Sequence, residues 1–414
     1  MNIATTPDLP IAVIGAGAAG CLAAISAAER GATVVLLERT SDGGRKILIS
    51  GGGRCNILPG ELREPRFVTD SSPNTLKKML RNWPLADQRR FFESDLALPL
   101  VLEPESGKLF PVSNRARDVR DGLINHARKT GVDLRFGVKV ESLKEAANGW
   151  QLELGGGETL TARAVILSTG GLSVPATGSD GWGLGVARAL GHTIHSTYAA
   201  LTPLTAEPAV HADLAGISLP VGLTAAGADR SAGSDGGFLF THRGYSGPSV
   251  LDVSHVLVRA RQEGKPAILR VRWGVRDEEF WQIALLARGA GQVNTLLRAE
   301  LPARLVDRLL VEAGVPGDTS LAQLRKEQRQ ALIEALVRYP LPVTGDEGYK
   351  KAEVTGGGVA LAEIDPHTME SRKAPRLYFC GEILDAFGPI GGYNFAWAWA
   401  TGRAAGIGAA GRDR

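Results

Sequence analysis

The feature that most constrains the fold of this chain is an apolar stretch interrupted by glycines, IAVIGAGAAGCLAAISAAERGATVVLLE, at residues 11–38. Gly15, Gly17 and Gly20 follow a short apolar run with the spacing G-x-G-x-x-G. The first glycine permits a tight turn, the second lets the backbone approach a diphosphate, and the third lets a helix pack on a strand. The stretch therefore predicts a strand, a glycine turn, a helix and a second strand, which together form a dinucleotide-binding unit.

The acidic residue that ends this stretch indicates the kind of nucleotide. Glu38 lies 18 residues after Gly20 and closes the second strand. A carboxylate at this position accepts hydrogen bonds from the ribose hydroxyls and repels a 2′-phosphate. The helix is expected to begin near Ala18, so that its free N–H groups and positive dipole end point at the phosphates. Ala18, Ala19 and Arg39 therefore join the glycines and Glu38 as candidate contacts.

A glycine-rich segment, SDGGRKILISGGGRCN at residues 41–56, follows the acid. Glycine destabilises both helices and strands, so this composition favours a loop that wraps closely around a ligand. Arg45 and Lys46 are expected to face phosphate oxygens. The backbone of Ser50, Gly51, Gly52 and Gly53 is expected to pass near a flat ring. The alternative is a mobile surface loop, but the position directly after the ribose-binding acid favours contact with the cofactor.

The other end of the chain carries a related pattern, RLYFCGEILDAFGPIGGYNFAWAWATGRAAG, at residues 376–406. Gly381 lets the chain pass the cofactor, and Glu382 is expected to face its diphosphate and ribityl groups. A glycine pair then opens a helix, and the candidate contacts at this start are Gly391, Gly392, Tyr393 and Asn394. In a flavoenzyme, the positive end of such a helix stabilises negative charge gained at the N1–C2=O edge of the isoalloxazine ring.

Two further glycine segments lie between the ends. A continuously apolar run at residues 164–167 leads to Thr169, Gly170 and Gly171, which are expected to form a second crossing of the chain over the cofactor. The segment GWGLGVARALG, at residues 181–191, is similar to a second nucleotide fingerprint. No strand directly precedes it and no acid-tipped strand follows it, so it predicts the start of a packing helix instead.

The rest of the chain predicts two inserted parts. Helical periodicity covers residues 74–94 and 117–130, with a hairpin between them that turns at Ser106-Gly107, and strands are expected within 132–143 and 149–167. Residues 196–272 predict short strands of a barrel-like β domain, and residues 277–339 predict helices. The expected fold is α/β, with a Rossmann-type domain of residues 1–195 and 345–414, an inserted β-rich domain of residues 196–275, and a helical subdomain of residues 276–344.

Composition narrows the range of partners. The 414 residues carry a formal net charge of +3, which is too small to indicate binding to nucleic acid or to a membrane surface. The apolar residues 9–28 contain glycines and lack a basic start, so we expect neither a signal peptide nor a membrane span here. We therefore expect a cytoplasmic protein. Three widely spaced cysteines and seven scattered histidines lack the spacing of a metal site or a redox dithiol.

The motifs IGAGAAG, KILISGGGRCN, LFPVSNRARDV, FTHRGYSGPSVLD, DPHTMES and GEILDAFGPIGGYNFAWAWATG, in this order, resemble the BaiN-like, aminoacetone-oxidase-like flavoprotein family over nearly the whole chain. The resemblance implies an FAD-dependent oxidoreductase with a Rossmann-type FAD domain, a β-barrel domain and a helical domain. Its members are linked to substrates as different as amines and unsaturated steroid ketones. By motif match it implies FAD contacts at Gly15, Gly17, Gly20, Glu38, Lys46, Gly51, Gly52, Cys55, Asn56, Gly171, Glu382, Gly392 and Asn394. The backbone around Val140 is a further candidate, for the adenine.

The catalytic groups are the least constrained part of the sequence. In FTHRGYSG, His242 or Tyr245 is predicted to line the substrate side and to exchange a proton while flavin N5 transfers a hydride. The favoured function is an FAD-dependent oxidoreductase for a small organic substrate. The sequence does not decide whether the electrons come from NAD(P)H or from the substrate, with oxygen as acceptor. It does not decide the oligomeric state either.

Two other classes of function compete with this interpretation. One is a flavin-dependent protein that modifies or binds RNA, and the other is a flavin-binding sensor without turnover. The arginines of the helical subdomain alternate with acidic residues, which argues against RNA because phosphate contacts need clustered cations.

Overall fold

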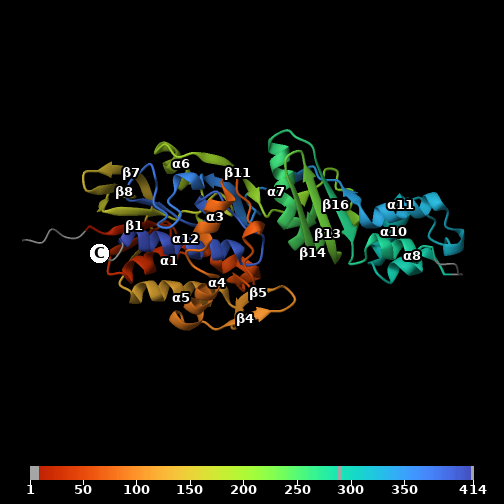
Figure 1. Ribbon diagram of the computed structural model, residues 1–414, viewed down its shortest axis with the longest axis horizontal. Coiled ribbons are helices and arrows are strands. Elements are labelled where there is room, and N and C mark those ends of the chain that lie inside the picture. The colour runs from red at the N-terminus through yellow and green to blue at the C-terminus, as the bar shows by residue number, and fades with distance from the viewer. Residues whose placement is uncertain (1–8, 287–290, 412–414) are drawn as a thin grey trace, which may run out of the picture. The chain divides into compact units, whose positions relative to one another are not determined.

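The computed structural model describes residues 9–286 and 291–411 (Figure 1). The chain folds as two compact units, which we call the first and the second unit. The first unit consists of residues 1–197 and 354–414, and the second consists of residues 198–353. Both ends of the chain therefore belong to the same unit, and the second unit is inserted between them.

A five-stranded parallel sheet forms the centre of the first unit. Its order is β20 (Leu377–Phe379), β10 (Ala164–Leu167), β1 (Ile11–Ile14), β2 (Val34–Glu38) and β6 (Asp133–Phe136). The central strands β1, β10 and β2 are buried at every residue, which explains their continuously apolar sequences. The first and the last strand of the sequence thus share one sheet, which confirms the predicted Rossmann-type domain built from both termini.

Two helices from opposite ends of the chain pack against each other beside this sheet, as Figure 1 shows for α1 (Ala18–Ala28) and α12 (Tyr393–Ala410). Gly402 and Gly406 of α12 lie so close to α1 that a Cβ at either position would overlap the carbonyl oxygens of Ala19 and Ala23. Small residues on both helices permit this backbone contact. The pair holds the amino-terminal glycine turn and the carboxyl-terminal segment together.

Smaller elements complete the first unit. The predicted helix at residues 74–94 is two helices separated by Pro84, because proline lacks the N–H that a continuous helix requires. The predicted hairpin is confirmed as an antiparallel pair of strands, β4 (Leu100–Glu103) with β5 (Lys108–Pro111). The remaining elements are α2 (Arg45–Ile49), β3 (Leu58–Pro59), α3 (Pro73–Leu80), α4 (Leu85–Arg90), β4 (Leu100–Glu103), β5 (Lys108–Pro111), α5 (Ala116–Lys129), β7 (Val140–Ala146), β8 (Gly149–Leu154), β9 (Thr159–Ala162) and α6 (Trp182–Ala189).

The second unit is built on a seven-stranded sheet, reached through β11 (Ile194–Ala200) and left through β19 (Val354–Val359), which pair with each other. The order of the sheet is β17 (Tyr339–Leu341), β16 (Ala267–Trp273), β13 (Ser218–Gly227), β14 (Ser231–Thr241), β15 (Gly244–Ser246), β12 (Leu204–Thr205) and β18 (Gly345–Asp346). Within the described residues β17 and β18 are its two edges, so the sheet is open and does not close into the expected barrel.

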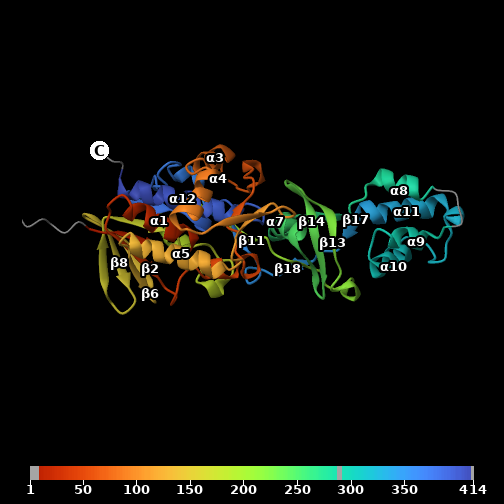
Figure 2. The same cartoon turned by 90° about the horizontal axis from the view of Figure 1, so that it is seen from below.

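Helices account for the rest of the second unit. α7 (Pro248–Gln262) packs on β13 and β14, although its sequence was expected to form strands and turns. Proline at its first position and a buried Val-rich face explain the helix. The predicted helical segment contains α8 (Glu278–Ala284), α9 (Val293–Arg298), α10 (Ala303–Glu312) and α11 (Lys326–Val337), as Figure 2 shows. The division of this unit into two domains at residues 275 and 344 stays a prediction.

Candidate functional site

The three glycines of the amino-terminal turn have the three different environments that the motif requires. Gly15 has a φ of 103°, and a Cβ there would lie 2.7 Å from the Ser168 carbonyl oxygen. A Cβ at Gly20 would overlap the Gly15 carbonyl oxygen, because α1 packs directly on the turn. Nothing lies within 4 Å of a Cβ placed at Gly17. The open space beside Gly17, at the start of α1, is where a diphosphate would approach the helix.

Glu38 is fixed at the end of β2 by donors from neighbouring backbone. Its Oε2 accepts a hydrogen bond from the Ala16 N–H at 2.8 Å, and its Oε1 accepts from the N–H and the hydroxyl of Thr40, both at 2.7 Å. The residue is only 8% exposed. The carboxylate therefore lies beside the glycine turn in one orientation, as expected for a group that binds ribose hydroxyls.

The glycine-rich loop places one of its two predicted cations at the carboxyl-terminal segment. Lys46 Nζ lies 2.5 Å from Glu382 Oε2 and 2.5 Å from Ser173 Oγ. Arg45 instead forms an ion pair with Asp42 at 2.8 Å, and Arg39 forms one with Asp180. Lys46 is thus the loop cation that joins the two ends of the chain.

The remaining loop positions combine open backbone with internal hydrogen bonds. Gly51, Gly52 and Gly53 all have positive φ angles, and Gly52 and Gly53 have free space beside them. The Ser50 hydroxyl donates to the Ile47 carbonyl within the loop at 2.7 Å. Asn56 N lies 3.1 Å from a Cβ placed at Gly51. Gly52 and Gly53 therefore leave the backbone exposed at this end of the loop.

Glu382 is the centre of a network that the sequence did not reveal. Its Oε1 accepts hydrogen bonds from the Ser173 hydroxyl at 2.5 Å and from the Thr355 N–H at 3.0 Å. The Thr355 hydroxyl in turn accepts from the N–H groups of Leu172 and Ser173. Gly171 leaves no room for a side chain, because a Cβ there would overlap Thr355. Three segments distant in sequence thus converge on one carboxylate.

The start of α12 is shaped by glycine and asparagine. Gly391 and Gly392 have φ angles of 103° and 94°, and a Cβ at Gly392 would overlap the backbone of Leu58. The Asn394 side chain accepts from the Gly388 N–H and donates to the Gly388 carbonyl, both at 2.9 Å. The Tyr393 ring is buried against Phe67. Asn394 therefore holds the loop before the helix, and the backbone N–H groups of its first turn are the free donors.

Other predicted contacts are placed as follows. Burial raises the pKa of the Cys55 thiol to about 12, so this cysteine is a neutral core group. The Thr169 hydroxyl is buried against Gly183 without a hydrogen-bond partner among the described residues, so the backbone of Thr169 and Gly170 is the part available to a ligand. The Ala19 side chain lies against Gly381. Val140 begins β7, close to Val138, whose N–H donates to the Glu38 carbonyl.

The two predicted catalytic residues lie in the second unit, in different settings. His242 is exposed in the turn between β14 and β15. Tyr245 is buried, and its hydroxyl lies 2.8 Å from His211 Nδ1, while His211 Nε2 lies 3.0 Å from the Tyr339 hydroxyl. Burial raises the pKa of Tyr245 and lowers that of His211. Tyr245 therefore belongs to a buried, neutral chain of hydrogen-bonding groups.

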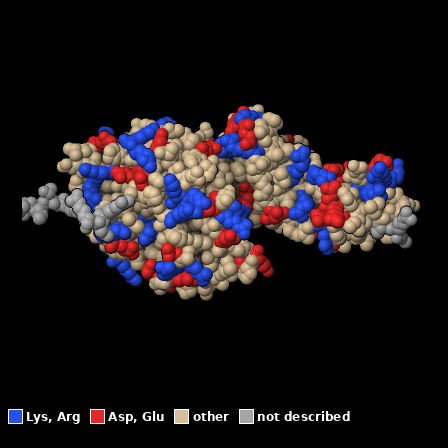
Figure 3. All heavy atoms as spheres, in the orientation of Figure 1, with Lys and Arg blue, Asp and Glu red and all other residues tan. Residues whose placement is uncertain are grey.

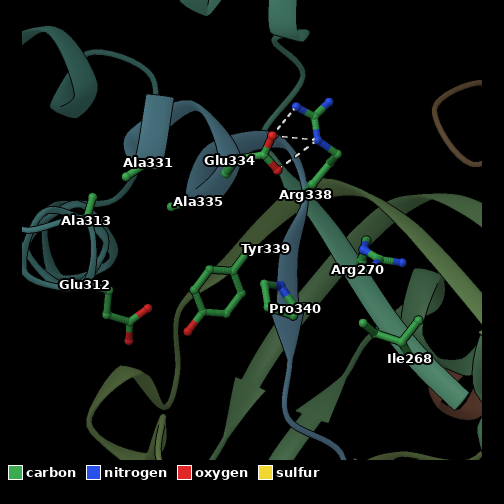
Figure 4. A pocket seen from close by; sticks show the side chains of 10 residues that line it. All are labelled: Ile268, Arg270, Glu312, Ala313, Ala331, Glu334, Ala335, Arg338, Tyr339 and Pro340. Carbon is green, nitrogen blue, oxygen red and sulfur yellow. Dashed lines mark hydrogen bonds and ion pairs between the residues drawn. The ribbon is translucent and has the colours of Figure 1, made fainter. Parts of the chain in front are cut away.

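Tyr339, the last of these hydrogen-bonded groups, lines a cavity of about 440 Å³ in the second unit. Figure 4 shows its lining, where Arg338 is paired with Glu334 and Tyr339 lies near Glu312. Burial and the Glu312 carboxylate raise the pKa of Tyr339. Two arginines and two glutamates line the cavity, so it presents no excess charge of either sign.

The first unit has the groups needed to hold a dinucleotide. The cradle at Gly17, the ribose acid Glu38, the cation Lys46, the exposed glycine backbone of residues 51–53 and the start of α12 fit the diphosphate, ribose and ring of FAD. Within residues 9–286 and 291–411, no group of His, Cys, Asp or Glu side chains is arranged to hold a metal ion. None of the helices in that part of the chain has the length and apolar character to cross a bilayer.

Charge on the surface is mixed. Residues 198–353 contain 18 Lys and Arg and 18 Asp and Glu. On the face in Figure 3, basic and acidic residues alternate over both units. Many of them are paired, as in the contacts of Arg276 with Glu300 and of Arg338 with Glu278.

The chain matches a protein family and several known proteins. The HI0933-like protein Rossmann domain matches residues 9–408. The chain is 35% identical over 399 residues to a ribosomal RNA dihydrouridine synthase of Escherichia coli, covering 94% of this chain and 95% of that protein. A protein of the same name from Haemophilus influenzae is 32% identical, with coverage of 94% and 95%. The 3-dehydro-bile acid delta(4,6)-reductase of Clostridium scindens is 33% identical over 411 residues, with coverage of 97% and 99%.

A solved structure shares the fold. It is the 3-ketosteroid delta1-dehydrogenase from Sterolibacterium denitrificans in complex with 1,4-androstadiene-3,17-dione, with a TM-score of 0.51 at 14% identity. The match covers 98% of this chain and 100% of that one.

Proposed function

Because this chain belongs to the HI0933-like family of FAD-dependent oxidoreductases, we propose that it uses FAD to reduce a carbon–carbon double bond conjugated with a carbonyl group. The names of two relatives of this chain describe the same type of reaction, and this observation supports the proposal. A 3-dehydro bile acid with delta(4,6) double bonds is a conjugated ketone, and a dihydrouridine synthase saturates the double bond beside a carbonyl of the uracil ring. One reaction describes both.

The reaction adds a hydride and a proton across the double bond. FAD, when bound, supplies the hydride through its isoalloxazine ring. The hydride adds to the carbon farther from the carbonyl, the electron pair moves to the carbonyl oxygen, and a protein group or water delivers a proton to the nearer carbon. NAD(P)H is the proposed donor of the two electrons and one proton that restore reduced FAD.

The proposed contacts follow from the geometry of the first unit. Glu38 would bind the ribose hydroxyls, and the start of α1 and Lys46 would face the diphosphate. Glu382 would orient Lys46 and the adjoining ribityl region. The start of α12 would stabilise negative charge on the ring. His242 and Tyr245 stay proposals for residues that line the substrate side.

We propose a small conjugated ketone as the substrate, in a cytoplasmic protein. The balanced charge of the second unit and the mixed surface in Figure 3 support a small molecule, because RNA phosphates require clusters of unpaired cations. A uracil of ribosomal RNA is the second candidate, favoured by the names of two relatives at 35% and 32% identity. Both candidates undergo the same saturation.

The experiment is an anaerobic reoxidation assay. The flavin is photoreduced, and 2-cyclohexen-1-one, 4-androstene-3,17-dione or a uracil-containing ribosomal RNA transcript is added, with cyclohexanone as the saturated control. We expect the conjugated ketones to restore the oxidised-flavin spectrum and to gain two hydrogen atoms by mass. Reoxidation by the transcript alone would assign the RNA substrate. Failure of every conjugated acceptor to react would exclude the proposed reaction. Bleaching of the oxidised flavin by NADH or NADPH tests the electron donor.

A further inference from the structure

A second polar cluster in the first unit is not explained by cofactor binding. It consists of Ser71, His195 and Asp385, which come from three distant parts of the chain. Ser71 Oγ lies 2.8 Å from Asp385 Oδ2 and 3.4 Å from His195 Nε2, and His195 Nε2 lies 3.7 Å from Asp385 Oδ2. The Asp385 side chain is 2% exposed, whereas the His195 side chain is 29% exposed. A buried carboxylate thus stands behind a histidine that solvent or a ligand can reach.

The hydrogen bonds decide which histidine nitrogen is available. Asp385 Oδ2 accepts from the Thr69 hydroxyl and from the backbone N–H groups of Asp70 and Ser71. The Ser71 hydroxyl has one proton and donates it to the same carboxylate. The Ser71 oxygen then accepts from the Leu361 N–H at 3.0 Å and from His195 Nε2–H. Nε2 therefore carries a fixed proton, and Nδ1, which makes no hydrogen bond to a described residue, is the nitrogen that can exchange one.

The cluster lies next to the flavin end of the candidate site. Asp385 is three residues after Glu382 and three residues before Gly388, the residue held by Asn394 at the start of α12. Three residues span at most about 11 Å even in an extended chain. A bridge between Val68 and Phe387 keeps the segment that contains Ser71 beside this loop.

We propose that His195 is the proton donor to the substrate carbon in the flavin reaction, with Ser71 and Asp385 as its positioning residues. The inference rests on the proposed function, because saturation of a conjugated double bond requires one proton besides the hydride. The donated proton leaves Nδ1, and the ring is reprotonated from solvent. A buried carboxylate that orients a histidine and stabilises its cation is a general arrangement for proton transfer.

The surroundings of Asp385 raise its pKa overall. Burial raises the pKa of Asp385, while the hydrogen bond from Ser71, the charge of His195 and the hydrogen bond from Thr69 act in the opposite direction, and Asp70 adds to the increase. His195 Nε2 faces this carboxylate at 3.7 Å.

The first experiment needs no substrate. Reduction of flavin places negative charge on the ring, which favours protonation of a nearby histidine. From the pH dependence of the midpoint potential between about pH 6 and 8, we expect wild-type holoprotein to take up more than one proton per two electrons. His195→Gln should take up one, and the exposed His367→Gln of the same unit should match the wild type. Equal proton uptake in wild type and His195→Gln would overturn the proposal, whatever the substrate is.

The second experiment follows reoxidation of photoreduced enzyme by 2-cyclohexen-1-one and, separately, by ferricyanide, which accepts electrons without a proton on carbon. His195→Gln should lower the rate with the conjugated ketone about 100-fold and leave the ferricyanide rate unchanged. Ser71→Ala removes one of the groups that position His195 and should show a smaller loss. An equal loss with both acceptors would indicate a structural role and contradict the proposal. If the wild type itself does not react with the ketone, the proposed function fails, and the proton-uptake experiment still decides the role of His195.

Discussion

The two ends of the candidate cofactor site are built in different ways. At the ribose end, Gly15, Gly20 and Glu38 lie within one stretch of strand, turn, helix and strand. At the flavin end, the carboxylate network of Glu382 and the cluster of His195 and Asp385 join segments that are more than 150 residues apart in sequence. The comparison teaches that a local motif identifies the cofactor, whereas the groups that act on a substrate depend on tertiary contacts.

The largest effect is expected at the tightest position of the local motif. Gly20→Val would force a side chain into the Gly15 carbonyl, so the free energy of unfolding should fall by about 4 kcal/mol or more. Gly17→Ala is the matched control, because space is open there and its φ of −79° suits alanine. It should unfold in urea like the wild type but bind FAD at least tenfold more weakly. Normal FAD binding by Gly17→Ala would remove the diphosphate from this turn.

These two glycines show why the ribose end could be predicted from sequence. Their spacing within one stretch of strand, turn and helix predicts these roles, although Gly20 also lies against Ser168, a contact that spacing does not reveal. Lys46 was predicted to meet phosphate, and the structure adds Glu382 and Ser173 beside it, because that contact exists only after β20 joins the sheet. Ser71 and His195 have no sequence signal, since their pattern appears only when both lie beside Asp385. The helix α7 was missed because its glycine-rich approach resembles strands and turns.

The next effect concerns the charge that selects the ribose. Glu38→Gln places an NH2 group opposite the N–H of Ala16 or Thr40, so one donor loses its acceptor. FAD affinity should fall about 10- to 100-fold, as for loss of a hydrogen bond to a charged group. Titration of apoprotein with FAD, followed by flavin fluorescence, measures this change. Glu145→Gln, at an exposed position of β7 in the same unit, is the control and should bind like the wild type. Unchanged affinity in Glu38→Gln would move the ribose away from β2.

A smaller effect is expected at the flavin end. Asn394→Ala removes two hydrogen bonds to Gly388 and releases the loop before α12. FAD affinity should fall about 3- to 10-fold. Asn125→Ala on the exposed face of α5 is a matched control without effect on FAD. If both variants bind FAD equally well, the loop at Gly388 is not held by Asn394.

The smallest effect is expected at Glu363, whose contacts with Lys373 and Thr193 we assign to the stability of the fold and not to the flavin reaction. Burial alone would raise the pKa of Glu363, but hydrogen bonds from Lys373 and Thr193 outweigh it and lower the pKa to about 2. Because the folded-state pKa lies below the ordinary value of 4.5, Glu363 stabilises the fold above about pH 4.5 and loses this effect as the pH falls towards 2. The difference in urea midpoint between wild type and Glu363→Gln should shrink over that interval. A constant difference would refute the assigned pKa, and no change in flavin reoxidation is expected at neutral pH.

The most direct test of the account is the amount of FAD bound by the purified chain. We expect one non-covalent FAD per chain, released by heat, with the neutral thiol of Cys55 left unmodified. Gly17→Ala should hold this FAD more weakly while keeping its fold. A folded wild-type chain that is colourless and does not take up added FAD would contradict the central claim.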